Sequence, residues 1–180
     1  MSNRFKANVT QLEFLEATFY SARSVYNDSL VGFTIKHDLQ KTGGTLIDAS
    51  YTELLKVFEE RATVPPYSLL SKTHKAVALE KLKELSVVLT DFINAGTKDL
   101  IWNVPYQTRH VESSCVFPSD TFKIIDDTLL IEGLTSPIYL GTKVEEASVQ
   151  TVIVTRHGKG EYSFTLCQPE YMSSVGAIHG

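Results

Sequence analysis

The sequence predicts an α+β fold, namely a small, OB-like β-barrel with a helical insertion between its first strand and its remaining strands. Three observations lead to this fold. A short strand-like segment opens the chain, helical periodicity dominates residues 10–99, and short β-rich runs separated by turn signals follow. Because a single early strand needs a sheet to join, we expect residues 1–9 and 100–180 to form the barrel and residues 10–99 the insertion.

The opening strand is expected at Arg4–Asn8, and a helix follows it at once. Thr10 and Glu13 form a capping box, in which the Thr side chain caps the helix and the Glu side chain bonds back to the cap. Apolar side chains then recur at spacings of three and four residues, at Leu12, Leu15, Phe19, Ala22 and Tyr26. This period predicts an amphipathic helix over residues 11–31.

Two more helices are expected before residue 97. Ser50 and Glu53 form a second capping box, which opens a helix that runs through Arg61. The run Val64-Pro65-Pro66 ends this helix, since Pro lacks the amide hydrogen that a helix interior needs. A long third helix is expected over residues 68–94, with Gly96 as its C-terminal stop.

The rest of the chain has the pattern of a meander of strands. Residues 149–156 alternate between two faces, and Val152, Val154 and Arg156 share one of them. Residues 157–160, with the sequence His-Gly-Lys-Gly, supply turn residues before a returning strand at 162–166. This arrangement predicts a β-hairpin.

The composition is that of a globular chain, with 43% hydrophobic residues, 21% charged residues and a net charge of −4. No apolar run approaches the roughly 20 residues that a membrane helix needs, so we expect no membrane association. The N-terminus carries no apolar leader, which favours a cytoplasmic location. Cys115 and Cys167 lack any metal-ligand spacing, so we expect free buried thiols, no metal and no cofactor.

Catalytic motifs give no support for an enzyme. His37, His74 and His110 have no Ser or Cys partner at a recognisable spacing. Gly43-Gly44 lacks the Lys-Ser or Lys-Thr of a phosphate-binding loop. Asp126-Asp127 stands in a predicted turn, where Asp is common for backbone reasons. We therefore expect no catalytic residues.

Residues 4–30 resemble the N-terminus of the TnpB proteins, which are transposon-encoded relatives of the type V CRISPR effectors. The family pattern is a basic residue, a few strand residues, Gln, a Leu-rich turn, Thr-Phe, and then Arg-x-x-Tyr-Asn-x-x-Leu. Its places are filled in register by Arg4, Gln11, Leu15, Thr18, Phe19, Arg23, Tyr26, Asn27 and Leu30. Further along the chain, Phe117-Pro118, Gly160 and Tyr162 match later features of the family.

The resemblance implies that the barrel is a wedge domain and the insertion a helical recognition lobe, which together hold a guide RNA and its target duplex. In the family, the next strand begins the RuvC nuclease with Gly-Ile-Asp-x-Gly, and Gly176–Gly180 has Ile178 in the Asp place. Two-metal hydrolysis needs several clustered carboxylates. We therefore expect a nuclease-deficient, TnpB-like RNA-binding protein that holds a structured or guide-type RNA in a nucleoprotein complex.

Eight residues are candidates for contacts with RNA, since Arg, Lys and Asn side chains bond to the nucleic-acid backbone. For Arg23 and Asn27 the alternatives are an ion pair and the capping of a nearby loop. For the helical lysines the alternative is a solvated helix face, and for the hairpin cations it is ordinary turn charge. The eight are Arg4, Lys6, Arg23, Asn27, Lys72, Lys75, Arg156 and Lys159.

A protein-interaction role is the second function that the sequence supports. The acidic balance favours it, because RNA-binding chains are usually basic. Such a module could act as a decoy or inhibitor of an RNA-guided nuclease, or as a recruited subunit of another complex. Trp102 and Tyr106 are the candidate partner-binding residues, and the alternative for them is to cover one end of the barrel.

Overall fold

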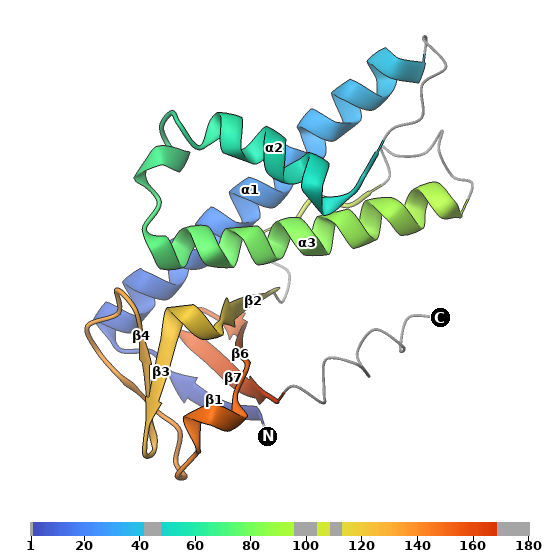
Figure 1. The fold of residues 1–180 in the computed structure, drawn as a ribbon. Coiled ribbons are helices and arrows are strands. Elements are labelled where there is room, and N and C mark those ends of the chain that lie inside the picture. Colours follow the sequence, from blue (N-terminus) through green and yellow to red (C-terminus); the bar gives the residue numbers. More distant parts are fainter. Residues whose placement is uncertain (1, 42–47, 96–103, 109–112, 169–180) are drawn as a thin grey trace. The chain divides into compact units, whose positions relative to one another are not determined.

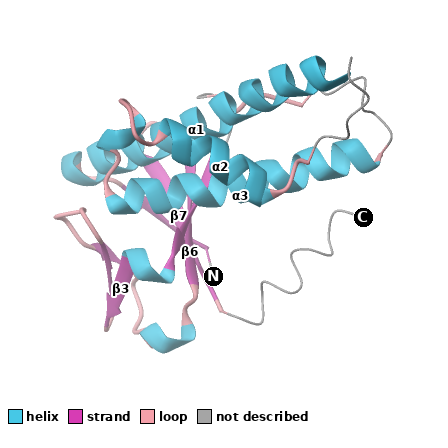
Figure 2. Cartoon of the chain, turned by 45° about the horizontal axis from the view of Figure 1, so that its top comes forward, coloured by secondary structure: helices cyan, strands magenta, loops and turns pink. Residues whose placement is uncertain are grey.

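The computed structural model describes residues 2–41, 48–95, 104–108 and 113–168 and confirms the α+β class (Figures 1 and 2). Its helices are α1 (Val9–Lys41), α2 (Tyr51–Arg61) and α3 (Lys72–Asn94), with 3₁₀ turns η1 (Tyr67–Leu69), η3 (Ser119–Thr121) and η4 (Glu146–Ser148). Its strands are β1 (Ser2–Lys6), β2 (Ser113–Pro118), β3 (Phe122–Ile125), β4 (Thr128–Ile131), β5 (Ile138–Tyr139), β6 (Thr151–Gly158) and β7 (Glu161–Cys167). None of the helices described is both long enough and apolar enough to cross a bilayer.

The chain divides into two compact units. The sheet unit consists of Met1–Phe19, Ser71–Val77 and Glu112–Gly180, and the helical unit consists of Tyr20–Leu70 and Ala78–Val111. The first part of α1 and the start of α3 thus belong to the sheet unit, whereas the sequence suggested one uninterrupted helical insertion over residues 10–99.

Four strands form the larger sheet of the sheet unit, in the order β1-β7-β6-β2 and antiparallel throughout. β1 pairs with β7 from Ser2↔Thr165 to Lys6↔Glu161, which confirms that the first strand joins a sheet made by late residues. β6 and β7 form the expected hairpin. Gly160 in its turn has a φ of 78°, a conformation that glycine adopts without steric strain.

The smaller sheet has the order β3-β4-β5, and among the strands described neither sheet closes into a barrel. The expected β-barrel is therefore wrong. β2 ends at Pro118, which has no amide hydrogen to continue a ladder. The turn η3 follows directly, and Thr121 Oγ1 donates to the Pro118 carbonyl oxygen at 2.7 Å. This break separates β2 from β3, so the strands form two open sheets instead of one closed ladder.

Aromatic side chains fill the inner side of the larger sheet. Tyr162 is fully buried, and its ring stacks on Phe5 at 5.8 Å and packs against Phe19 at 6.0 Å. Burial of such large apolar side chains is the main source of folding free energy. The first part of α1 is thereby attached to the face of the sheet that carries Phe5 and Tyr162.

The cap of α1 differs from the expected one. Asn8 Oδ1 accepts from the Gln11 amide at 2.9 Å, and Gln11 Oε1 accepts from the Asn8 amide at 3.0 Å. This is a reciprocal capping box with Asn as the cap and Gln three residues later. The Thr10–Glu13 box is therefore wrong, and α1 begins at Val9.

The helical unit has its own core between α1, α2 and α3. Ser50 caps α2 as expected, since its side chain accepts from the Glu53 amide. Ser68 lies in η1, so the expected start of the third helix is wrong; Ser71 Oγ accepts from the His74 amide, and α3 begins at Lys72. The buried core residues are Val25, Tyr26, Leu30, Phe33, Ala49, Leu54, Phe58, Ala78, Leu82, Leu85, Leu89 and Val104.

Candidate nucleic-acid interface

β1 directs two basic side chains to one side of the larger sheet. Successive side chains of a strand alternate between faces, so Arg4 and Lys6 lie on one face and Phe5 on the other. The Phe5 ring packs on Tyr162 inside the sheet unit. Arg4 and Lys6 therefore point away from that packing, and both are exposed.

Hydroxyl side chains continue this face across the sheet. Arg4 stands opposite Ser163, Ser163 opposite Thr155, and Thr155 opposite Ser114, so one residue from each strand makes a continuous row. Residues directly opposite on antiparallel strands share a face. We call the face that carries this row and Lys6 the outer sheet face. Ser114, Thr155 and Ser163 were not among the expected site residues, because their alignment depends on strand register.

The β6–β7 turn brings a third cation to the same end of the sheet. The Ala7 amide donates to the Gly160 carbonyl oxygen at 2.9 Å, which places the turn beside the end of β1. Lys159 is exposed in this turn. Lys6 stands opposite Glu161, the one acidic residue within the two strands β1 and β7. Arg4, Lys6 and Lys159 are thus the expected RNA-contacting residues that the fold brings together.

His157 adds an imidazole ring to the outer sheet face. Its Nε2 lies 2.8 Å from Ser163 Oγ, and the His side chain is exposed while the Ser side chain is buried. His157 follows Thr155 by two residues in β6, so strand alternation places it on this face. The His157 ring and the hydroxyl groups of the row can donate hydrogen bonds to phosphate and ribose oxygens. The hydroxyl oxygens can also accept hydrogen bonds from ribose hydroxyl groups.

Arg156 lies on the opposite face and serves the packing of the sheet unit. Its side chain is 7% exposed, and Nη1 lies 3.5 Å from Glu16 Oε2. Its guanidinium also lies 5.7 Å from the centre of the Phe19 ring, and Tyr162 donates to Glu16 Oε1 at 2.8 Å. Because so little of the Arg156 side chain is exposed, it has almost no surface that a phosphate could contact. The sequence contained the signal, because Arg156 shares a strand face with the buried Val152 and Val154.

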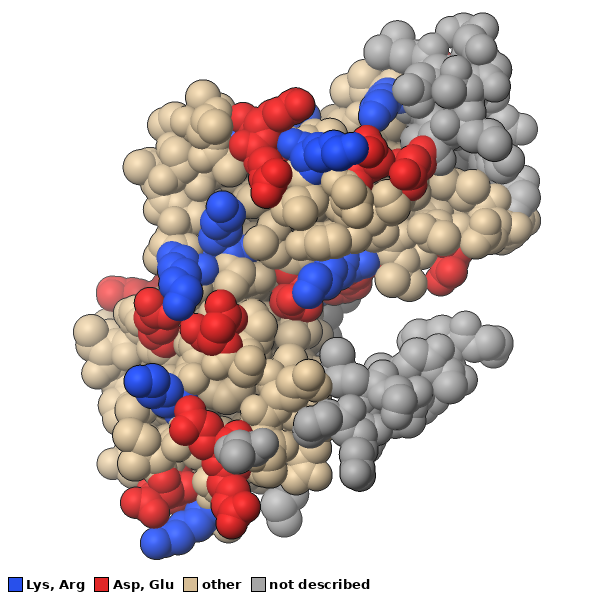
Figure 3. All heavy atoms as spheres, in the orientation of Figure 1, with Lys and Arg blue, Asp and Glu red and all other residues tan. Residues whose placement is uncertain are grey.

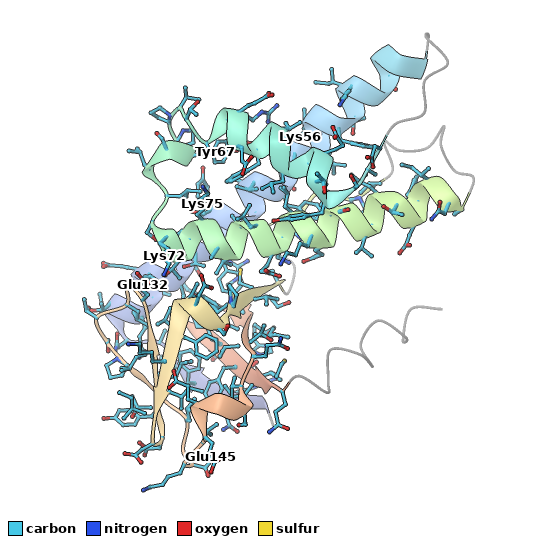
Figure 4. All side chains as sticks on the ribbon, viewed as in Figure 1. Lys56, Tyr67, Lys72, Lys75, Glu132 and Glu145 are labelled. Carbon is cyan, nitrogen blue, oxygen red and sulfur yellow. The ribbon has the colours of Figure 1, made fainter. Side chains whose placement is uncertain are left out.

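Lys72 and Lys75 lie at the start of α3. Figure 4 shows Lys72 and Glu132 pointing toward one another, and their Nζ and Oε2 atoms are 3.1 Å apart. Thr73 Oγ1 also donates to the Glu132 carbonyl oxygen at 2.7 Å. Lys72 therefore joins α3 to the end of β4, while Lys75 is exposed.

The remaining expected residues belong to the helical unit. The Asn27 side chain donates to the Gln107 carbonyl oxygen and accepts from the Gln107 amide, both at 2.9 Å. Asn27 therefore caps a loop, which is the alternative that the sequence offered to RNA contact. Arg23 has its guanidinium 5.6 Å from the centre of the Tyr20 ring. Tyr106 is 47% exposed, and Trp102 lies outside the described residues.

Charge is mixed on the face of the molecule shown in Figure 3. There, Lys and Arg side chains are scattered among Asp and Glu side chains and gather into no basic groove. The described residues contain no group of three or more His, Cys, Asp or Glu side chains arranged to hold a metal ion. The three cations at one end of the outer sheet face are therefore the clearest candidate site for an anionic polymer.

Comparison with protein-family models and with curated proteins finds no match for this chain. The likeness to TnpB proteins therefore rests on the residues quoted for it, and the family stays a prediction.

Proposed function

We propose that this chain is a non-catalytic RNA-binding protein that holds a structured or guide-type RNA within a nucleoprotein assembly. The observation that carries the proposal is the joint position of Arg4, Lys6 and Lys159 at one end of the outer sheet face. Exposed Arg and Lys side chains bind phosphates, and this electrostatic contribution dominates the affinity for nucleic acids.

The hydroxyl row supports RNA as the ligand. Ser114 and Thr155 are half-buried and stand next to one another on β2 and β6, so they present hydroxyl groups across the sheet from Arg4. Such groups can bond to the ribose 2′-hydroxyl, which distinguishes RNA from DNA. The TnpB resemblance of residues 4–30 points to the same class of ligand.

Salt-dependent binding of a labelled stem-loop RNA tests the proposal. The variant Arg4→Gln/Lys6→Gln/Lys159→Gln removes three charges without touching the buried side chains. Each lost phosphate contact lowers the slope of log K against log salt by about 0.7 to 0.9, so we expect the slope to fall by about 2 to 3. Binding is measured by fluorescence anisotropy between about 50 and 200 mM salt, and DNA of the same sequence tests the role of the 2′-hydroxyl.

The matched control is Lys56→Gln/Lys123→Gln/Lys143→Gln, which changes the net charge equally at exposed positions outside the outer sheet face. We expect this variant to keep most of the affinity and of the salt slope. Equal losses in the two triple variants would show a diffuse charge effect and contradict the proposed site. An affinity that salt leaves unchanged would contradict RNA binding itself.

A protein-interaction module, acting as a decoy, an inhibitor or a recruited subunit, is the second candidate function. The observation that favours it is the exposure of apolar and aromatic side chains in the helical unit, among them Tyr20 at 64%, Leu69 at 78% and Tyr106 at 47%. Tyr and other large side chains of this kind concentrate in protein interfaces.

A further inference from the structure

The sheet unit contains a cavity of about 660 Å³ at the end of the larger sheet where β1 begins and β7 ends. We call it the sheet-end cavity. Part of its lining is apolar and deeply buried, since four of the lining residues are only 2 to 7% exposed, namely Leu140, Val149, Phe164 and Cys167. We call these four residues the floor of the cavity. Uncharged polar residues also line it, and among them Thr142 and Gln168 are exposed.

Backbone hydrogen bonds hold the walls of the sheet-end cavity in place. The Val144 amide donates to the Asp126 carbonyl oxygen at 2.9 Å, which fixes the segment after β5 to the turn between β3 and β4. The Gln150 amide donates to the Cys167 carbonyl oxygen at 2.9 Å, which joins the residues before β6 to the end of β7. The cavity is thus formed by the folded backbone itself, as most sites for small molecules are.

The lining of the cavity carries no ionisable side chain of the charged types. None of the described residues that line it is Asp, Glu, Lys, Arg or His. Lys143, next to the lining residue Val144, points its charge elsewhere, since its Nζ lies 3.4 Å from Asp126 Oδ1. An ion in the cavity would lose hydration without gaining an opposite charge, which is costly. The lining therefore favours a neutral ligand over a phosphate or a carboxylate.

Two polar side chains of the lining already use a donor within the chain. Asn3 Nδ2 donates to the Leu140 carbonyl oxygen at 3.0 Å, and Ser148 Oγ donates to the Glu145 carbonyl oxygen at 2.6 Å. The side-chain oxygens of Asn3 and Ser148 can still accept a hydrogen bond, because each has two lone pairs. A ligand with an N–H or O–H group is therefore better matched to these two residues than one that only accepts.

We propose that the sheet-end cavity binds a neutral, mainly apolar small molecule that carries a hydrogen-bond donor. The apolar body of the molecule would lie on the floor, and its donor would bond to Asn3 Oδ1 or Ser148 Oγ. The volume falls within the range of roughly 300 to 1,000 Å³ that is typical of small-molecule sites. The inference goes beyond RNA binding and does not depend on it, because no cation lines the cavity to hold a phosphate.

Two fluorescent probes with the same ring system test the preference for a neutral ligand. N-phenyl-1-naphthylamine is neutral and has one N–H donor, and 1-anilinonaphthalene-8-sulfonate is the same molecule with an added sulfonate. We expect the neutral probe to bind the full chain at least about ten-fold more tightly, because an unpaired charge is costly to bury. Fluorescence titration measures both affinities. Equal affinities, or no binding of the neutral probe, would overturn the proposal.

A third compound tests the role of the donor. 1-Phenoxynaphthalene has the shape of the neutral probe, but an ether oxygen replaces the N–H group. In competition with the neutral probe, we expect it to bind about three-fold to ten-fold more weakly, which is the contribution of one hydrogen bond. An equal or higher affinity of the ether would overturn the assignment of a donor to the ligand.

Substitutions of Val144, a half-buried lining residue, test the location. Val144→Trp fills part of the cavity and should weaken the neutral probe by more than about ten-fold. Val144→Lys adds a cation to the lining and should reduce the preference for the neutral probe over the sulfonate. The matched controls are Val116→Trp and Val116→Lys, at a half-buried residue of β2 that does not line the cavity, and both should bind as the wild-type chain does.

Circular dichroism checks that the four variants fold. Equal losses at Val116 and Val144, or an unchanged preference between the probes in Val144→Lys, would overturn the proposal. A wild-type dimer in sedimentation that Val144→Trp dissociates would also overturn it, because the cavity would then be an interface between two copies of the chain.

Discussion

Among single residues, His74 combines an aromatic neighbour with a buried ring nitrogen that lacks a hydrogen-bond partner among the described residues. Its ring packs against Phe14 with the two centres 5.1 Å apart, and its Nε2 is buried without a hydrogen-bond partner among the described residues. Burial lowers the pKa of His74, because a cationic ring in this position loses hydration that no acceptor replaces. The neutral form of His74 is therefore the one that the folded sheet unit favours.

This preference predicts a loss of stability in mild acid. Below the ordinary His pKa of about 6.5 the unfolded chain binds a proton that the folded chain still excludes, so the free energy of unfolding should fall as pH falls from this value through the lower folded pKa. His74→Phe should remove this part of the pH dependence. Urea unfolding at several pH values measures it, and Lys75→Gln is the control on the same helical turn. An unchanged pH profile in His74→Phe would contradict the assignment.

Among the elements, those that local patterns define were predicted best. The spacing of Leu15, Phe19 and Tyr26 anticipated α1, and the Ser50–Glu53 box anticipated the start of α2. The helix start at residue 9 was missed because the sequence offers two overlapping capping boxes there. Only the side-chain geometry shows that Asn8 and Gln11 form the bonds, and that Thr10 does not.

The two boxes differ in what they predict for stability. Asn8→Ala removes the acceptor of the Gln11 amide and should cost about 1 kcal/mol. Thr10→Ala should change the free energy of unfolding by less than about 0.5 kcal/mol, as for an ordinary surface position. Urea unfolding followed by circular dichroism measures both. Asn8→Asp keeps the acceptor and should recover most of the loss, whereas a larger effect at Thr10 than at Asn8 would contradict the observed cap.

The candidate site shows why pairing between elements escapes a sequence. Arg4 and Lys6 were expected singly, as basic residues that could contact RNA, but the row of Arg4 with Ser163 and Thr155 depends on the register of three strands. Register is fixed by the turn and by which face is buried, and neither is visible in one strand alone. The prediction of a barrel was wrong for a related reason. Whether two edge strands pair depends on breaks in the chain such as the one at Pro118, and the alternation pattern of a strand does not show this.

At the scale of the whole molecule, the net charge conceals how charge is distributed. The chain carries a formal charge of −4, yet the proposed RNA-binding surface is locally positive. At this end of the outer sheet face Arg4, Lys6 and Lys159 outnumber Glu161. An overall acidic balance is therefore compatible with a site for an anionic ligand, provided that the site binds through a few ordered contacts and not through the field of the whole chain.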